Sequence, residues 1–165
     1  MIIILSNRLV SFLRFLQPKL VILLFFIICY SCQSENENET QIDAIPVEIS
    51  LDRFDLKFYN QPASVIPNLK SQYPFLFPKQ FSDSIWISRQ TDSLQLLLQN
   101  EVNKTFESTD LIESELSHLF KHIKFYFPST VVPKVITLTN NVDYQIKTVY
   151  LDSLILLSLD TFLGS

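Results

Sequence analysis

Two histidines stand four residues apart, at His118 and His122. Positions i and i+4 share one face of an α-helix, so the pair has the spacing of two zinc ligands. Metallopeptidases with this spacing place a glutamate base directly after the first histidine, where this chain has Leu119. The sequence indicates no third ligand, and helical periodicity turns both histidines away from the apolar stripe. We expect ordinary surface histidines, with metal ligation as the alternative.

A second pair of reactive side chains is Cys29 and Cys32, which form a C-x-x-C pattern. A redox or zinc role is disfavoured, because Cys29 lies inside an apolar run and no second cysteine pair is present. Ser31 offers the small side chain that lipoprotein signal peptidase needs before the acylated cysteine, although Cys29 and Tyr30 depart from the preferred lipobox residues. The thiolate of Cys32 would accept the lipid, so we predict lipid attachment at Cys32.

The segment ahead of Cys32 has the pattern of a leader. An apolar run at 20–30 follows a stretch whose only charges are basic. As a helix, the run would extend roughly 16 Å, about half of the ~30 Å hydrocarbon core of a bilayer. It is too short to span a membrane by itself, so we predict a lipoprotein signal peptide over 1–31. A tilted, uncleaved anchor is the alternative.

The residues after Cys32 are polar and acidic. We interpret 32–45 as a solvated tether, because it alternates Glu with Asn and has few apolar residues. Gln33, in place of Asp, is similar to the sorting pattern of outer-membrane lipoproteins, and the alternating acids are similar to export tags of surface lipoproteins. The simpler alternative is that these acids only keep a linker extended. The folded domain is expected over 46–165.

Composition excludes several classes of function. Beyond Cys32 the chain has ten Lys and Arg against seventeen Asp and Glu, which argues against a nucleic-acid partner. The only glycine is Gly164. Phosphate-binding loops, dinucleotide-binding turns and esterase nucleophile elbows all need glycine, so none of them is expected. We infer no cofactor and no small-molecule substrate.

Hydrophobic periodicity predicts an α+β domain, with amphipathic helices packed on a small mixed or antiparallel sheet. Alternating apolar residues indicate a strand, and apolar residues recurring every three or four positions indicate a helix. The expected helices are 64–73, 92–107 and 110–126, and the expected strand segments are 47–53, 131–139 and 146–159, the last two forming two or three strands.

Two of these segments carry more detailed expectations. Asp92 and Gln95 have the form of a capping box, and Leu94, Leu97 and Val102 are expected on the buried face of the helix that follows. The segment 153–159 is almost wholly apolar, which favours a strand buried on both faces. Since such a strand needs a cover on each side, the domain is expected to be incomplete within this chain.

Three segments resemble a known family. They are RFDLKFYN (53–60), SELSHLFKHIKFYFPSTVVPKVITLTNNVDY (114–144) and VYLDSLILLSLDTFLG (149–164). Together they look like the gliding motility lipoprotein family GldB of the Bacteroidota, and the similarity runs over nearly all of 46–164. The shared motifs are strings of aromatic and aliphatic residues, with no catalytic signature among them.

The resemblance implies a cell-envelope lipoprotein, at the outer membrane, that works beside the gliding and secretion machinery through protein partners. We expect no enzyme activity. Family members continue past 159–164, so 46–165 would be the N-terminal part of a truncated, zincin-like domain. A helix carrying H-E-x-x-H would then lie after Ser165. The alternative function is a degenerate or incomplete zinc metallopeptidase-like hydrolase of the envelope.

Overall fold

The computed structural model describes residues 35–164. The predicted leader and both cysteines lie outside this range. The chain divides into two units at the bond between Ile45 and Pro46, and each is treated by itself. In the first unit, Glu35–Asp43 forms helix α2, where the sequence predicted only a solvated linker. This segment contains neither Gly nor Pro, so its backbone can close helical hydrogen bonds. Among the described helices, none is both long and apolar enough to cross a membrane.

The second unit is built on one four-stranded mixed sheet, in the order β1-β2-β4-β3. Strands β1 (Leu51–Arg53), β2 (Lys134–Leu138) and β4 (Leu154–Ser158) are parallel to one another. The edge strand β3 (Thr148–Leu151) runs antiparallel to β4. Helices accompany the sheet, so the predicted α+β class is confirmed, and of the two sheet types expected the mixed one is found.

The first predicted strand is shorter than expected. Val47 and Ile49 are buried and their neighbours exposed, as the alternation predicted, but only Leu51–Arg53 pairs as a strand. The preceding backbone bonds to side chains of a helix instead: Ser117 Oγ accepts from Ile49 N at 2.9 Å, and Glu113 Oε1 accepts from Leu51 N at 2.8 Å. These side chains cover the outer edge of β1, which would otherwise be open to pairing.

The predicted helices are present. Helix α6 (Ser93–Thr105) begins after Asp92, whose carboxylate accepts from the backbone N–H groups of Leu94 and Gln95, both at 3.0 Å. Helix α7 (Asp110–Tyr126) has the predicted bounds. The helix expected at 64–73 consists of a 3-10 turn and α4 (Ile66–Gln72), with a proline in its first turn.

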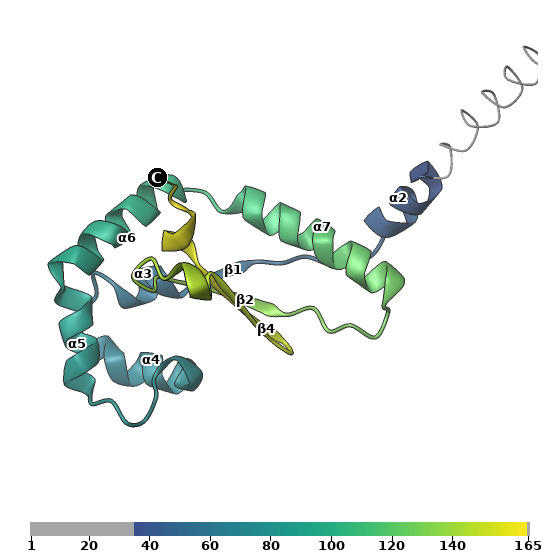
Figure 1. The fold of residues 1–165 in the computed structure, drawn as a ribbon. Helices are drawn as coiled ribbons and strands as arrows, with labels where there is room; N and C mark the ends of the chain where they lie inside the picture. Colours follow the sequence, from purple (N-terminus) through teal and green to yellow (C-terminus); the bar gives the residue numbers. More distant parts are fainter. Residues whose placement is uncertain (1–34, 165) are drawn as a thin grey trace, which may run out of the picture. The chain divides into compact units, whose positions relative to one another are not determined.

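Two helices of the second unit were not predicted, α3 (Phe54–Phe58) and α5 (Asp83–Thr91). The first is a single turn, and the second buries only Trp86 and Gln90, too few positions to give a periodic signal. In Figure 1, α5 and α6 follow each other at one end of the strands, and α7 runs alongside the sheet. Single 3-10 turns complete the unit at Pro74–Leu76, Tyr144–Ile146 and Leu159–Phe162.

The buried face of α6 differs from the prediction. Val102 is fully buried, as predicted, but Leu94 and Leu97 are 74% and 62% exposed, and the unpredicted Gln99 is almost fully buried. The reason is a hydrogen bond at 2.9 Å from Gln99 Nε2 to the carboxylate of Asp55, which is itself fully buried. A buried carboxylate needs hydrogen-bond donors. The face of α6 that carries Gln99 therefore packs toward Asp55, and the face with the most leucines points to solvent.

The core gathers on one side of the sheet. It is an aromatic cluster of Phe54, Phe58, Tyr59, Ile66, Leu69, Tyr73, Phe77, Trp86 and Ile136. Leu154 and Leu156 of β4 pack against this cluster, while Ile155 and Leu157 line a groove beneath α7. Strand β4 is thus interior and contacted on both faces, as predicted, but three of its five residues are only half-buried.

Candidate functional site

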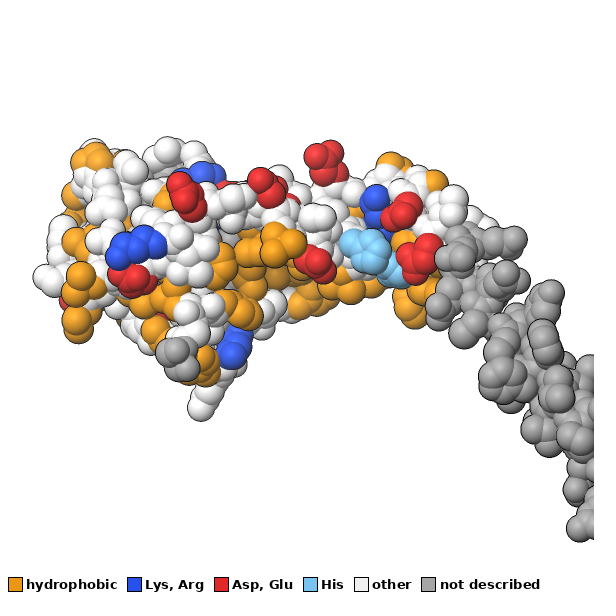
Figure 2. All heavy atoms as spheres, turned by 90° about the horizontal axis from the view of Figure 1, so that it is seen from above, with side chains coloured by type: hydrophobic (Ala, Val, Ile, Leu, Met, Phe, Trp, Pro, Cys, Tyr) orange, Lys and Arg blue, Asp and Glu red, His pale blue; other side chains and the backbone are white. Residues whose placement is uncertain are grey.

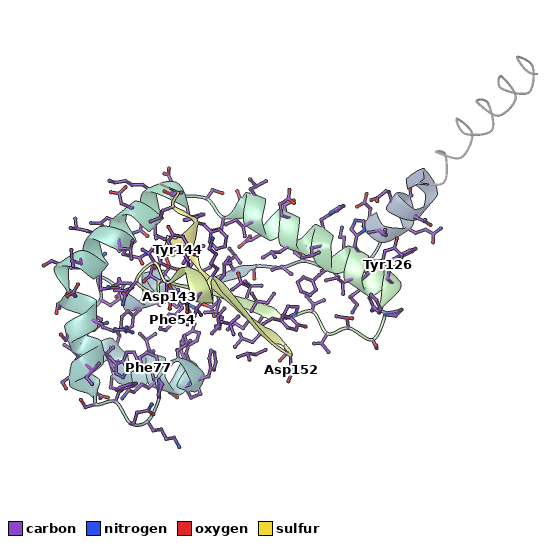
Figure 3. All side chains as sticks on the ribbon, viewed as in Figure 1. Phe54, Phe77, Tyr126, Asp143, Tyr144 and Asp152 are labelled. Carbon is purple, nitrogen blue, oxygen red and sulfur yellow. The ribbon has the colours of Figure 1, made fainter. Side chains whose placement is uncertain are left out.

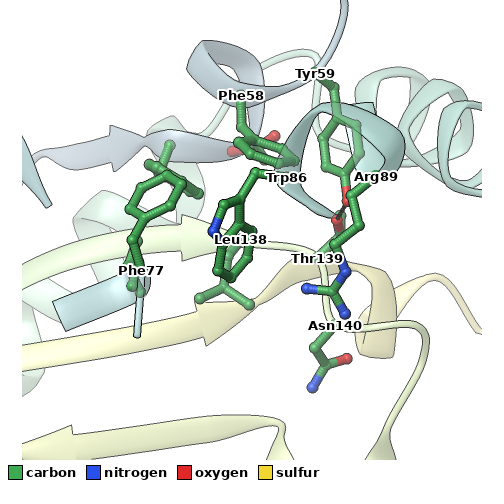
Figure 4. A pocket seen from close by; sticks show the side chains of 11 residues that line it. Phe58, Tyr59, Phe77, Trp86, Arg89, Leu138, Thr139 and Asn140 are labelled. Atoms are coloured by element: carbon green, nitrogen blue, oxygen red, sulfur yellow. Dashed lines mark hydrogen bonds between the residues drawn. The ribbon is translucent and has the colours of Figure 1, made fainter. Parts of the chain in front are cut away.

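A cavity of 220 Å³ lies beyond the carboxyl ends of β1 and β2. Figure 4 shows it from close by, with side chains contributed by α3, α5 and the end of β2. Ligands of sheets with parallel strands commonly bind at this end of the strands, because the connecting loops diverge there. The lining residues are Phe54, Asp55, Phe58, Tyr59, Leu76, Phe77, Trp86, Arg89, Leu138, Thr139 and Asn140.

Aromatic rings form most of the cavity wall. Phe77 meets Trp86 edge-to-face, with ring centroids 4.9 Å apart, and also lies 6.0 Å from Phe54 and 6.3 Å from Phe58. All four side chains are buried. Since each ring is held by another ring, the wall is preorganised, and an apolar group entering it would not need to order these side chains.

Asp55 forms the charged base of the site. Arg53 donates to its carboxylate from Nε at 2.9 Å and from Nη2 at 2.7 Å, and Gln99 and Thr137 donate to it as well. Burial raises the pKa of Asp55, but the hydrogen bonds from Arg53, Thr137 and Gln99 outweigh burial and leave the pKa below its ordinary value. Asp55 is therefore a charged, saturated anchor joining α3, α6 and β2.

The rim of the cavity is polar. Tyr59 OH donates to Gln95 Oε1 at 3.1 Å and accepts from Thr139 Oγ1 at 3.1 Å. The guanidinium of Arg89 lies 5.8 Å from the ring centroid of Trp86, in a cation–π contact. Burial raises the pKa of Tyr59, so its phenol stays protonated at neutral pH.

Two donors at this site have no acceptor among the side chains and backbone of residues 35–164. The indole Nε1 of Trp86 is buried without a hydrogen-bond partner, and no carboxylate of the described residues lies within ion-pair distance of Arg89. The base of the cavity already has its charge neutralised by Arg53. The arrangement therefore favours a small ligand with an apolar or aromatic body and an anionic group that can reach Arg89.

A second polar cluster surrounds Asp52, a residue of β1. Its carboxylate pairs with Lys57 Nζ at 2.5 Å and Lys134 Nζ at 2.6 Å, and it accepts from Tyr73 OH at 2.9 Å. Burial raises the pKa of Asp52, but hydrogen bonds from Lys134, Lys57 and Tyr73 outweigh it and lower the pKa overall. These contacts tie β1, α3, β2 and α4 together.

The predicted histidine pair stands on α7, outside the cavity lining. His118 is exposed and His122 is partly exposed, as the periodicity predicted. Their Nε2 atoms lie 3.2 Å apart. Pale blue histidine side chains are visible at the surface in Figure 2. Metal ligation by His118 and His122 stays the untested alternative. Lipid attachment at Cys32, which lies outside the described residues, stays a prediction.

Comparison with known families decides the identity. The sequence model of the family described as "Gliding motility protein GldB" matches residues 35–165. The chain belongs to the GldB family. This confirms the resemblance found in the sequence, and it makes the chain a gliding-motility-associated lipoprotein of the cell envelope. The searches of curated proteins and of solved structures each gave no match, and the zincin-like fold is not confirmed.

The sequence of this GldB-family protein carried only a faint sign of the cavity. Trp86 and Arg89 are three residues apart in an element that periodicity did not predict. Their i, i+3 spacing would have placed them on one face of a helix, had the helix been recognised. The remaining lining residues come from segments far apart in sequence, which only the folded chain brings together.

Proposed function

We propose that this GldB-family protein is a non-enzymatic component of the gliding machinery, held at the outer membrane by lipid on Cys32. The family match over residues 35–165 carries this proposal. In it, residues 1–31 direct export and are removed, 33–45 separate the domain from the bilayer, and the α+β unit from 46 onward contacts protein partners of the motility and secretion machinery.

In this proposal, the lipid on Cys32 is what holds the protein at the membrane. One acyl chain holds a protein to a bilayer only marginally, whereas two or more chains hold it stably. Bacterial lipoproteins carry several chains on their first mature residue. Cys32 would become that residue, since it follows the predicted leader and a small side chain, Ser31.

The polar groups of the cavity support a binding role in preference to catalysis. A general acid or base needs a pKa near the working pH and a free hydrogen-bonding position. The pKa of Asp55 is lowered, and its oxygens accept from Arg53, Gln99 and Thr137. A carboxylate held in this way stabilises structure and has no proton to exchange at neutral pH.

Metabolic labelling with a clickable fatty acid in the native host tests the lipid attachment. We expect the wild-type chain and Cys29→Ser to take up label, while Cys32→Ser takes up none and loses its place in the outer-membrane fraction. Gliding should fail in cells that carry only Cys32→Ser. A Cys32→Ser chain that still takes up label and supports gliding would overturn the proposal.

A zinc hydrolase is the second candidate, because of one observation. Two nitrogens bound to one tetrahedral zinc ion lie roughly 3.3 Å apart for Zn–N bonds of about 2.05 Å, and the Nε2 atoms of His118 and His122 lie 3.2 Å apart. Zinc analysis of the purified full chain separates the candidates. Stoichiometric zinc that is lost when His118 and His122 are both changed to Ala would favour the hydrolase, and zinc-free protein would favour the non-enzymatic role.

A further inference from the structure

The carboxyl end of α7 carries exposed apolar side chains. Tyr126 is the last residue of the helix and Phe127 caps it, and they are 62% and 65% exposed; Val131 is 63% exposed. Thr130 N donates to Phe127 O at 3.0 Å, so the chain turns back at once and keeps Val131 beside the helix end. Figure 3 shows Tyr126 at the end of the unit that lies away from Phe77 and the aromatic core. We call Tyr126, Phe127 and Val131 the α7 tip.

The sequence around the α7 tip has only basic charges. Between residues 116 and 133 the only Lys, Arg, Asp or Glu are Lys121 and Lys124. The chain beyond Cys32 has an excess of acidic residues, so this stretch differs from the rest. Exposed aromatic residues close to lysines suit the headgroup region of a bilayer, because the rings can lie among the upper acyl chains while the ammonium groups reach lipid phosphates.

The chain enters the folded unit at this end of α7. Ile49 N donates to Ser117 Oγ, and Leu51 N donates to a side chain one turn earlier in the helix, that of Glu113. The segment leading into β1 therefore runs antiparallel to α7, as Figure 1 also shows. Two extended residues and four helical residues each advance about 6 Å, so segment and helix stay in step. The three residues back to Pro46 then cover about 10 Å, which reaches the last turn of α7.

The predicted lipid on Cys32 would hold this same end near a bilayer. Residues 33–45 are all that separate Cys32 from Pro46, and nine of them form α2. With about 1.5 Å for each helical residue and at most about 3.5 Å for each of the others, Pro46 lies within roughly 30 Å of the lipidated residue. The amino end of α7 lies about 25 Å further along the helix axis. Of the two ends of α7, the tip is therefore the one nearer to the lipid.

We propose that the α7 tip contacts the bilayer that holds the lipid of Cys32. Its three side chains enter the layer of headgroups and upper acyl chains, and Lys124 faces the lipid phosphates. The inference rests on the lipid attachment proposed above. Three side chains alone would bind a membrane weakly, but the lipid makes the second contact intramolecular and so raises its occupancy. The two contacts together orient the unit, with the end that carries α5 and α6 away from the membrane (Figure 1).

Fluorescence quenching of the lipidated full chain, purified from the native host, tests the contact. In the proposed mature form no thiol is free, because Cys29 leaves with the leader and the sulfur of Cys32 carries the lipid. Phe127→Cys then accepts a nitrobenzoxadiazole label at a single position. Leu111→Cys replaces an exposed leucine at the other end of α7 and is the matched control. The labelled chains are placed in vesicles of phosphatidylethanolamine and phosphatidylglycerol that contain lipid spin-labelled near the glycerol.

We expect the spin-labelled lipid to quench the label of Phe127→Cys severalfold more than the label of Leu111→Cys, which lies about 24 Å away along the helix axis. Equal quenching at the two positions would overturn the contact. Flotation of the vesicles separates this outcome from failure of the anchor. A chain that floats with the vesicles but shows equal quenching keeps its lipid and loses only the α7 contact. A chain that does not float lacks the anchor, and the inference falls with it.

Lys124 provides an independent readout in the Phe127→Cys background. Lys124→Glu should lower the quenching severalfold, because a carboxylate is repelled by the lipid phosphates, and Lys124→Arg should retain it. Lys79→Glu, at an exposed position before α5, makes the same change in net charge and should have no effect. Equal quenching in Lys124→Glu and in its parent would overturn the placement of Lys124 at the headgroups.

Discussion

Gln99 of α6 and Asp55 of α3 are joined by a hydrogen bond of 2.9 Å between Nε2 and Oδ2, with both side chains almost fully buried. The two residues are 44 positions apart in the chain. The contact links α3, which carries Asp55 at the base of the cavity, to α6. Because Asp55 also binds Arg53 and Thr137, the two sequence-distant helices and β2 are held through one carboxylate.

Asp55→Asn should destabilise the folded unit by about 3–5 kcal/mol, the usual cost of removing one partner of a buried ion pair. The guanidinium of Arg53, whose side chain is only 15% exposed, would lose its counter-charge. Urea unfolding followed by circular dichroism measures the loss. Glu101→Gln, which removes a surface ion pair with Lys104, is the control and should cost at most about 1 kcal/mol. Equal effects of the two changes would contradict the role of Asp55.

Stability should fall in acid. The pKa values of Asp52 and Asp55 are both lowered in the folded chain, through hydrogen bonds and ion pairs that outweigh burial. A depressed carboxyl pKa stabilises the fold above the pKa of the unfolded chain, about 3.9, and this stabilisation is lost as pH drops through the folded value. As far as Asp52 and Asp55 are concerned, the urea concentration at the unfolding midpoint should not change between pH 5 and 7. It should decline below about pH 4. Asp55→Asn should reduce the decline, and an unchanged slope in this variant would contradict the assignment.

Glu113→Ala should cost about 1 kcal/mol, because the partly buried backbone N–H of Leu51 would lose its acceptor. Glu113→Gln keeps an oxygen at the same position and should cost less. Glu115→Ala, on an exposed position of the same helix, is the matched control and should have little effect. Hydrogen exchange provides a second measurement, in which the Leu51 amide should lose protection in Glu113→Ala alone. Retained protection there would show that the edge of β1 is held by other contacts.

Trp86 should report occupation of the cavity, since it is the only tryptophan of the chain and lines the wall. Titration with 3-phenylpropionate should change its fluorescence saturably, because the ring fits the aromatic wall and the carboxylate can reach Arg89. The cationic analogue 3-phenylpropylamine should bind at least tenfold more weakly, which corresponds to about 1.4 kcal/mol.

Arg89→Gln tests the anion preference of the cavity. This exposed residue has no hydrogen bond to the core residues that the structure describes, so the variant should fold normally and bind the carboxylate about tenfold more weakly. Arg89→Lys keeps the charge and should retain part of the affinity. Equal affinity of wild type and Arg89→Gln for the carboxylate would contradict the anion preference.

Local patterns predicted those elements whose signals lie within the element itself. The bounds of α7 followed from an apolar stripe sustained over its 17 residues, and the start of α6 followed from the side chain of Asp92. The start and the end of a helix depend on residues within one turn, so the local sequence is enough to predict them. The family resemblance could also be found from the sequence, because its motifs are contiguous strings of aromatic and aliphatic residues.

The buried face of α6, the length of β1 and the cavity were decided by tertiary structure. Periodicity shows that a helix has an apolar side, but Gln99 turns inward only because Asp55 requires a donor there. The residues before β1 do not pair with another strand, because their backbone N–H groups donate to the side chains of Ser117 and Glu113, more than sixty positions away in the sequence. Such choices depend on which polar groups must be satisfied after distant segments meet, and no local pattern contains that information.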